Sequence, residues 1–189
     1  ESPMKETHKA VLKLAKKNHA IISFDPNIRL PLWSSAEACQ ETVREFLPDA
    51  DLVKLSDEEC FFVTGKHSIL DAADWLFEQG CKMVLYSMGK EGAMILTPHF
   101  SSHVENPEVR VKDTTGAGDA IIGAYLYCLA KNHITVSQLA DCLPEQVQEW
   151  LTFAVYYANY SITKSGAIAS YPDYTTFVKW MQEKRKKAH

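Results

Sequence analysis

The chain has 189 residues, of which 46% are hydrophobic and 23% are charged, a composition typical of one soluble globular domain. A formal net charge of −4 argues against a nucleic-acid surface, and the basic run Lys184-Arg185-Lys186-Lys187 is interpreted as a solvated helix end. The five cysteines include no C-x-x-C pair, which favours reduced thiols in a cytoplasmic protein and disfavours structural zinc. No apolar stretch reaches the length of a membrane span, so a membrane is not expected as a partner. The net charge likewise argues against a nucleic acid as a partner.

Apolar periodicity predicts alternating helices and strands through most of the chain. Helices are expected over residues 4–18, 34–47, 68–79, 136–142, 144–163 and 174–186, with two more beginning after residues 56 and 119. Strands are expected over residues 19–24, 51–55, 82–87 and 92–97, with shorter ones within 99–112. Because strands alternate with helices over residues 19–86, we expect a parallel sheet with helices on both faces, which is a three-layer α/β fold.

Two helices of the first half carry start signals. Ser34 and Glu37 have the spacing of a capping box, in which two side chains bond the first backbone amides of a helix, and Ser56 and Glu59 repeat that spacing. By pattern alone, the second pair needs no role beyond this cap. The inner face of the helix over 68–79 is expected to contain Ile69, Leu70, Ala73, Leu76 and Phe77.

Two polar segments follow predicted strands, and the first of them has two readings. Asp25-Pro26-Asn27-Ile28-Arg29 comes after the first strand, and open α/β sheets bind ligands at the carboxyl ends of their strands. The same segment is an ordinary turn, in which Asp and Asn bond their own backbone, and alone it favours this structural reading. Met88-Gly89-Lys90-Glu91 joins two strands and is explained by a hairpin.

The segment Asp113-Thr114-Thr115-Gly116-Ala117-Gly118-Asp119 is the most typical of a functional site. Glycines at a helix start expose backbone amides where the helix dipole favours an anion such as phosphate. Asp119 adds a carboxylate that could take a hydroxyl proton during phosphoryl transfer. The alternative is a tight turn with a first-turn acid, and a bare G-x-G-D supports both readings about equally. No G-x-x-x-x-G-K-[ST] sequence occurs, which disfavours a P-loop enzyme.

The full D-T-T-G-A-G-D-A string resembles the C-terminal signature of the ribokinase-like (PfkB-type) carbohydrate kinases. Residues 25–29 resemble the D-P-N-x-R of fructokinase-type members. Residues 56–59 carry S-x-x-E where the family has N-x-x-E, and residues 87–92 carry S-x-G-x-x-G where it has T-x-G-x-x-G. Residues 166–172 resemble the closing G-A-x-x-x-x-P loop. The resemblance implies a Rossmann-like ribokinase fold.

The resemblance also implies roles for these residues in catalysis and nucleotide binding. Asp119 would be the catalytic base, and the amides of Gly116, Ala117 and Gly118 would stabilise the transferring phosphoryl group. Residues of the hairpin, the central segment and the closing loop would contact the nucleotide: Ser87, Gly89, Gly92, Thr114, Gly166 and Ala167.

Substrate and metal contacts follow from the same resemblance. Asn27 and Arg29 would lie near the phosphates or the sugar. Glu59 would help to place a magnesium ion and its waters, whereas Ser56 departs from the usual Asn and its role stays open. A monovalent cation, taken as potassium, would be bound by Asp113, Thr115, Ser161, Lys164, Gly166 and Ser170.

The resemblance therefore implies an ATP- and magnesium-dependent kinase of a sugar's primary hydroxyl, most like a fructokinase that forms fructose 6-phosphate. A 2-keto-3-deoxygluconate kinase or another sugar kinase of the family is the alternative within this class, and an inactive nucleotide-binding module is the alternative outside it. The family's N-terminal part of the sheet, its sugar-binding Gly-Gly motif and its lid have no counterpart here. Residues 1–189 are interpreted as the C-terminal nucleotide-binding and catalytic part of a kinase domain, inactive alone, with the missing half as partner. A homodimer is compatible with the full-length protein.

Overall fold

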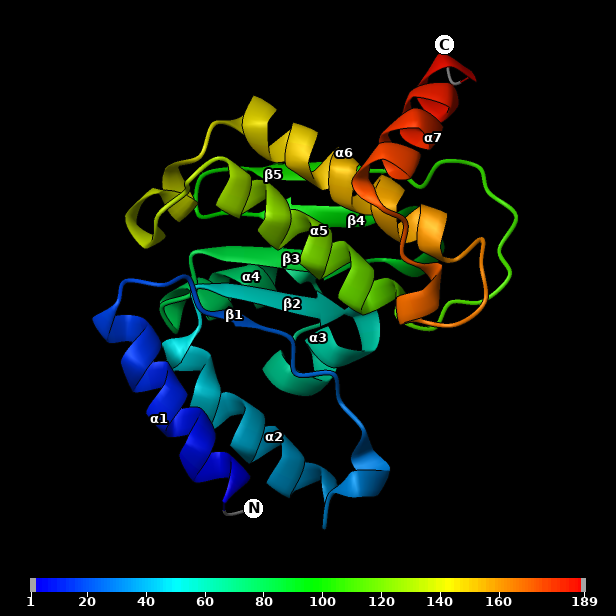
Figure 1. The fold of residues 1–189 in the computed structure, drawn as a ribbon. Helices are drawn as coiled ribbons and strands as arrows, with labels where there is room; N and C mark the ends of the chain where they lie inside the picture. The colour runs from blue at the N-terminus through cyan, green and yellow to red at the C-terminus, as the bar shows by residue number, and fades with distance from the viewer. Residues whose placement is uncertain (1–2, 188–189) are drawn as a thin grey trace. The chain divides into compact units, whose positions relative to one another are not determined.

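The computed structural model describes residues 3–187 and has the α/β character that the sequence predicts (Figure 1). Its helices are α1 (Met4–Lys17), α2 (Ala36–Phe46), α3 (Asp57–Thr64), α4 (Ile69–Glu78), α5 (Ala117–Lys131), α6 (Pro144–Ser161) and α7 (Tyr174–Lys187). Its strands are β1 (Ser23–Phe24), β2 (Leu52–Ser56), β3 (Met83–Ser87), β4 (Ala93–Leu96) and β5 (Ser101–Val104). Short 3-10 helices are η1 (Leu30–Leu32), η2 (Leu47–Asp49), η3 (Gly89–Glu91), η4 (Val136–Asp141) and η5 (Ile168–Ser170). The strands form one sheet in the order β1-β2-β3-β4-β5.

The chain divides into two compact units. Of the described residues, unit 1 contains 3–87, Met94–Ser101 and Ile134–Leu143. Unit 2 contains Met88–Ala93, Ser102–His133 and 144–187. Within residues 3–187, no helix combines the length and the apolar character that crossing a membrane requires.

Unit 1 is built from parallel β-α-β segments. β1 pairs with β2 and β2 pairs with β3, both in parallel, and the second register runs from Leu52 opposite Met83 to Ser56 opposite Ser87. The parallel pairing predicted for residues 19–86 is thereby confirmed. α2 connects β1 to β2, and α3 with α4 connects β2 to β3. Both β-α-β connections step in the same direction across the sheet, from β1 to β2 and from β2 to β3. Because such connections are right-handed, their helices lie on the same face of the strands.

The hydrophobic core of unit 1 lies between those helices and the strands. Val53 and Leu55 of β2 belong to it with side chains of the helices, which include Cys39, Val43, Cys60, Val63, Ala72, Ala73 and Leu76. Leu70, which the sequence places on the inner face of α4, is instead 59% exposed. The buried residues of α4 lie within three or four positions of Leu76 and therefore form one stripe along the helix. Leu70 lies beside that stripe.

The first strand is shorter than the sequence predicts. A strand is expected over 19–24, but β1 covers only Ser23–Phe24. The preceding residues close α1 instead, because His19 is left-handed (φ 53°) and the amide of Ala20 bonds back to a carbonyl of the helix. The chain joins the neighbouring strand only from Ile22, whose carbonyl accepts two amides of the segment at β2.

The cap of α2 is displaced by one residue from its predicted position. Ser35, rather than Ser34, is the N-cap, and its Oγ accepts the amide of Ala38 at 3.1 Å. Adjacent serines offer the same hydroxyl, so the pattern cannot distinguish them; the extended backbone at Ser35 decides. The second predicted capping box is confirmed, because Ser56 and Glu59 each accept the other's backbone amide.

Removing the observed cap should destabilise the protein more than removing the predicted one. We expect Ser35→Ala to lower the free energy of unfolding by about 1 kcal/mol, the usual loss at a serine N-cap. Ser34→Ala should change it by less than about 0.5 kcal/mol, as for other exposed positions away from such features. Urea unfolding of both variants measures the difference, and a larger loss for Ser34→Ala would place the cap at Ser34.

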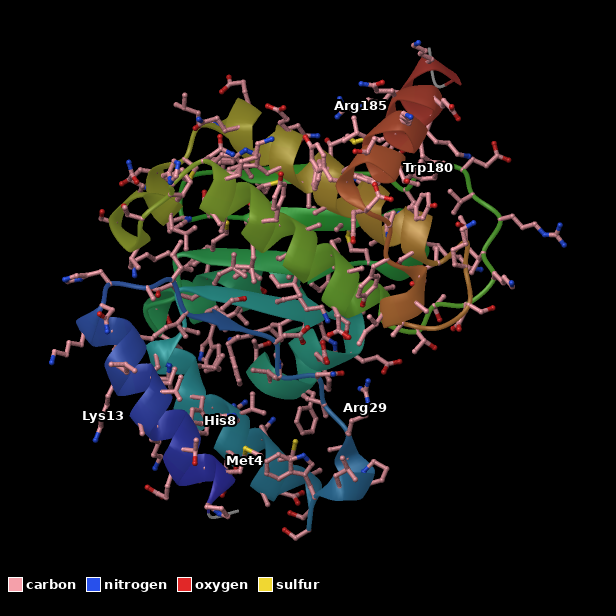
Figure 2. The ribbon with its side chains drawn as sticks, in the orientation of Figure 1. Met4, His8, Lys13, Arg29, Trp180 and Arg185 are labelled. Atoms are coloured by element: carbon pink, nitrogen blue, oxygen red, sulfur yellow. The ribbon has the colours of Figure 1, made fainter. Side chains whose placement is uncertain are left out.

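Unit 2 contains three long helices (Figure 1). α5 and α6 pack along one another, and α7 packs on α6. Phe177 of α7 lies edge-on to Phe153 and Tyr157 of α6, with ring centroids 4.9 and 5.1 Å apart. Trp180, labelled on α7 in Figure 2, lies edge-on to Tyr160 at 5.3 Å. Aromatic packing therefore fixes the C-terminal helix within this unit.

Candidate functional site

The glycine segment forms a tight turn at the start of α5. Gly116 is the N-cap and is left-handed, with φ 79° and ψ 5°. The amide of Ala117 donates to the carbonyl of Thr114 at 3.1 Å and so closes the turn. Gly118 and Asp119 are the second and third helical residues, whose amides have no carbonyl partner within the helix. The amides of Gly118 and Asp119 are therefore available to an anion, whereas the Ala117 amide is engaged in the turn itself. The donor role predicted for the Gly116 amide stays a prediction.

Asp119 is exposed on the first turn of α5. It borders a cavity of about 300 Å³ within unit 2, whose walls include the aromatic rings of Tyr157 and Tyr171. Burial and, to a smaller extent, the charge on Asp119 raise the pKa of Tyr171, so that its hydroxyl stays protonated and can donate a hydrogen bond. The carboxylate is thus beside both the helix N-terminus and a pocket that is open to solvent.

A side chain at Gly116 would collide with the closing loop. A Cβ there would lie 2.8 Å from Tyr171 Oη and 2.9 Å from Ala167 Cβ. Tyr171 Oη also donates to the Gly116 carbonyl at 2.9 Å. The structure therefore brings the closing loop, with its predicted nucleotide contacts Gly166 and Ala167, against the glycine turn. The sequence gave no role to Tyr171, although its hydroxyl holds the carbonyl of this turn.

Asp113 connects the start of the central segment to the closing loop. Its Oδ1 accepts the amide of Thr115 at 2.9 Å and the hydroxyl of Thr115 at 2.7 Å. Its Oδ2 accepts the amide of Gly166 at 2.9 Å. The bond from Gly166 and then those from Thr115 lower the pKa of Asp113 to about 2. Three of the six residues predicted for a monovalent cation are therefore in direct contact.

The other three predicted cation ligands belong to the end of α6 and the closing loop. Ser161 Oγ donates to the carbonyl of Ala158 at 2.7 Å, and the Ser161 carbonyl accepts the amide of Lys164 at 3.0 Å. Ser170 Oγ donates to the carbonyl of Ala167 at 2.6 Å. These oxygens keep lone pairs, and carboxylate, carbonyl and hydroxyl oxygens are ligands that hard cations accept, so the donor types fit. Within residues 3–187, no group of three or more His, Cys, Asp or Glu residues could hold a metal ion.

Protonating Asp113 should loosen its hold on the closing loop. Its pKa is about 2 when folded against an ordinary value of 3.8, so its stabilising contribution is full above the unfolded value and is lost as pH falls toward 2. We expect Asp113→Asn to lower Tm near neutral pH, and the difference from wild type to shrink as the pH falls below about 4. Thermal melts across that range measure it, and a difference that stays constant with pH would contradict this role.

Unit 1 carries a charged cluster at the ends of β1 and β2. Lys54 Nζ lies 3.3 Å from Asp25 Oδ2 and 3.7 Å from Glu59 Oε2. The side chains of Lys54 and Glu59 are only 8% and 10% exposed. The sequence pointed to Glu59 and to the segment that contains Asp25, but it gave Lys54 no role. A signal was present, since Lys54 interrupts the apolar run of β2 with a charge.

Both carboxylate oxygens of Glu59 accept hydrogen bonds. Oε1 accepts the amide of Ile28 at 3.1 Å, and Oε2 accepts the amide and the hydroxyl of Ser56 at 2.9 and 3.0 Å. Burial raises the pKa of Glu59, but the bonds from Ser56 and Ile28 and the charge of Lys54 outweigh it, so the pKa is lowered. Glu59 therefore stays ionised. With both oxygens engaged and an ammonium nearby, it fits magnesium through bound water rather than as a direct ligand.

Asn27 and Arg29 lie on the loop that follows β1, where Figure 2 labels Arg29. Asn27 is left-handed (φ 40°), and its amide donates to Asp25 Oδ1 at 3.2 Å. The guanidinium of Arg29 donates to the carbonyl of Ile28 at 2.9 Å and borders a cleft of about 260 Å³ together with Glu59. Unit 1 therefore brings the predicted substrate-side loop and the predicted magnesium residue together.

The hairpin loop contains two glycines with positive φ, Gly89 at 53° and Gly92 at 98°. A Cβ on Gly92 would lie 2.0 Å from the carbonyl oxygen of Val104, so close approach of the backbone requires this glycine. Asn106 donates its side-chain amide to the Gly89 carbonyl and accepts one from Asn159, both at 2.8 Å. Neither asparagine was predicted, although a buried Asn159 on the apolar inner face of α6 was an available signal.

Ser87 and Thr114 complete the predicted nucleotide contacts. Ser87 ends β3 in unit 1, and its Oγ donates to the carbonyl of Leu55 at 3.4 Å. Thr114 is exposed in the turn before α5 in unit 2. Their roles toward a nucleotide stay predictions.

Three features together are typical of a candidate phosphoryl-transfer protein. They are the parallel β-α-β segments, the left-handed glycine that opens α5 and the carboxylate on the first turn of that helix. The chain belongs to the pfkB family of carbohydrate kinases, because it matches that family over residues 1–174. The family predicted from the D-T-T-G-A-G-D-A string is thereby confirmed.

Several curated relatives of this chain are fructokinases. Fructokinase-2 from Solanum habrochaites is 34% identical over 171 residues, which cover 90% of this chain and 51% of the relative. Probable fructokinase-5 from Arabidopsis thaliana is 35% identical over 185 residues, which cover 97% of this chain and 56% of the relative. The chain therefore spans about half the length of the curated relatives it matches.

Solved structures of bacterial fructokinases have the same fold. The fructokinase from Xylella fastidiosa with bound ATP is similar with a TM-score of 0.90 and 26% identity, over 98% of this chain and 59% of that one. A fructokinase double mutant from Vibrio cholerae O395 with fructose, ADP and potassium ion is similar with a TM-score of 0.84 and 28% identity, over 96% and 56%. These similarities confirm the ribokinase-like α/β fold that the sequence predicts.

Proposed function

We propose that this chain is the nucleotide-binding and catalytic part of an ATP-dependent kinase that converts fructose to fructose 6-phosphate. The observation that carries the proposal is the exposed Asp119 carboxylate on the first turn of α5, beside amides that have no partner in the helix. The similarity to plant and bacterial fructokinases supports the choice of sugar.

In this proposal, Asp119 accepts the proton of the sugar hydroxyl as its oxygen attacks the terminal phosphorus of ATP and ADP departs. The amides of Gly118 and Asp119, at the positive end of the α5 dipole, stabilise the charge on the transferring phosphoryl group. The left-handed Gly116 and its bond from Tyr171 keep the turn in the shape that presents these amides. The Ala117 amide closes this turn, whereas the Gly116 amide keeps its proposed place among the donors to the phosphoryl group.

The proposed cofactors are ATP, magnesium and a monovalent cation such as potassium. Magnesium would neutralise charge on the phosphates, with Glu59 acting on it through water. Asp113 and the oxygens grouped with it would hold the monovalent cation, and Ser87 and the glycines of the hairpin and closing loops would contact the nucleotide. The Vibrio cholerae relative solved with ADP and potassium or calcium ion supports this set.

We also propose that sugar binding needs a segment equivalent to the rest of the relatives, because this chain spans only about half of their length. We further propose that the full-length protein is a cytoplasmic enzyme. A homodimer is compatible with it. Asn27 and Arg29 would lie near the phosphates or the sugar.

A coupled kinase assay tests the proposed function. The full-length protein is given ATP and magnesium with fructose, ribose or 2-keto-3-deoxygluconate, and nucleotide binding is measured in parallel by calorimetry. We expect the highest kcat/KM with fructose. A preference for 2-keto-3-deoxygluconate would support the proposed kinase activity but would show that fructose is not its substrate. Nucleotide binding without turnover on any sugar would identify an inactive nucleotide-binding module instead.

Residues 1–189 alone should bind ATP weakly and phosphorylate no sugar. Positioning of the two reactants accounts for roughly 7 to 11 kcal/mol of a barrier, and a chain without the sugar-binding half would lose it. Calorimetry with ATP and the same coupled assay measure both properties. Robust turnover from a sample whose intact mass shows no companion segment would overturn the need for the other half.

A further inference from the structure

Lys54 is a buried cation in an otherwise apolar strand. Side chains alternate along β2, and Val53 and Leu55 both belong to the core that packs against the helices of unit 1. Lys54 therefore points to the opposite face of the strand, where its side chain is only 8% exposed. Lysine is almost never buried to this degree unless its charge is paired, because an ammonium loses its hydration there.

Its partners are two carboxylates from different elements. Asp25 follows β1 and lies 3.3 Å from the Lys54 ammonium, and Glu59 of the first turn of α3 lies 3.7 Å from it. The side chains of Asp25 and Glu59 are only 19% and 10% exposed. One positive and two negative groups thus share a poorly hydrated place, where their interactions are screened less than at a surface.

Each carboxylate also fixes one point of the loop between β1 and η1. Asp25 Oδ1 accepts the amide of Asn27 at 3.2 Å and supports its left-handed backbone. Glu59 Oε1 accepts the amide of Ile28 at 3.1 Å. The ammonium of Lys54 is therefore the common neighbour of both anchors of the loop that carries Asn27 and Arg29.

Removing this ammonium would leave two buried carboxylates that repel each other. The unfavourable charge can then be relieved by protonation of one carboxyl group or by movement of the two apart. Either response weakens an acceptor that now holds a loop amide. A lysine that only filled space could be replaced by an uncharged side chain of equal length without this effect.

We propose that Lys54 is a positioning residue whose ammonium holds the Asp25 and Glu59 carboxylates in place and so fixes the loop that presents Asn27 and Arg29. The consequence for catalysis rests on the proposed kinase function, whereas the consequence for the loop does not.

The test compares Lys54→Met with Lys54→Arg and with a matched control in the full-length protein. Lys82→Met is the control, because Lys82 pairs with Asp51 at 2.7 Å and Asp51 in turn accepts the amide of Ile22. It removes a lysine from an ion pair that supports a backbone amide elsewhere in unit 1. Hydrogen exchange of a peptide spanning residues 23–30 reports on the loop, and a peptide spanning residues 117–131 serves as the reference.

We expect Lys54→Met to speed exchange of the loop peptide and to raise the KM of one substrate roughly tenfold, as for loss of one charged hydrogen bond, with a smaller change in kcat. Lys54→Arg should keep the loop exchange and the KM close to their wild-type values, because it keeps the positive charge. Lys82→Met should change neither the loop exchange nor the KM. If Lys54→Met fails to fold, Lys54→Gln carries the same expectation.

Unchanged loop exchange in Lys54→Met would overturn the proposal, and so would faster exchange with unaltered KM and kcat. Equal effects from Lys82→Met would also overturn it, since any lost ion pair would then suffice. Absence of kinase activity in the wild-type protein would refute the proposed function alone, and the loop claim would then be decided by hydrogen exchange.

Discussion

Asp119→Asn should abolish sugar phosphorylation in the full-length protein while leaving ATP binding nearly unchanged. The substitution keeps the size of the side chain but removes the carboxylate that accepts the hydroxyl proton. General-base catalysis contributes about a hundredfold to ten-thousandfold to a rate, and we expect kcat to fall within or beyond that range. Steady-state kinetics with fructose and calorimetry with ATP measure the two effects separately.

Asp71→Asn is the matched control for this substitution. Asp71 is also exposed and is also the third residue of its helix, α4, so the change removes the same charge from the same helical position. It should leave kcat within about twofold of wild type, since exposed substitutions away from a site have small effects. Near wild-type turnover in Asp119→Asn would show that the catalytic base lies elsewhere.

Gly116→Ala should destabilise unit 2 and remove the protection against heating that a nucleotide gives. Placing an alanine in the left-handed region lowers the free energy of unfolding by about 1 to 2 kcal/mol. Forcing a methyl group into a packed site lowers it further, by about 1 to 3 kcal/mol. Here the methyl group would meet Tyr171 Oη at 2.8 Å and Ala167 Cβ at 2.9 Å. The closing loop would have to move off the turn, which would displace the amides proposed to bind phosphate.

Gly65→Ala is the control that separates the strain of a left-handed backbone from the steric collision of the added methyl group. Gly65 caps α3 with φ 75°, close to the 79° of Gly116, but a Cβ there would meet nothing within 4 Å. Gly65→Ala should therefore show only the loss of about 1 to 2 kcal/mol for the left-handed backbone. Equal losses in the two variants, with nucleotide protection retained in Gly116→Ala, would count against a phosphate cradle at Gly116.

The parts of the site that the sequence predicts depend on neighbours in the chain. The capping box of Ser56 and Glu59 and the turn at Gly116 are made by residues within four positions of one another, and short motifs encode such contacts directly. The error at Ser34 has the same local origin, because two adjacent serines carry the same signal and the backbone chooses between them.

The parts that the sequence does not predict depend on residues far apart in the chain. Lys54 meets Asp25 across 29 positions, Asn159 meets Asn106 across 53, and Tyr171 meets Gly116 across 55. No periodicity or spacing encodes such pairs, since they follow from how strands and helices are placed in the fold. The available signals were single polar residues on apolar faces, at Lys54 and Asn159, which indicate that a partner exists without naming it.

The position of the phosphate on the product tests the proposed function most directly. The full-length protein is incubated with ATP, magnesium and fructose, and the phosphosugar is examined by proton–phosphorus correlation NMR. We expect the new phosphorus signal to couple to the protons of fructose carbon 6, and we expect no such signal with Asp119→Asn. Transfer to another hydroxyl, ATP consumption without a phosphosugar, or an equal signal from Asp119→Asn would contradict the proposal.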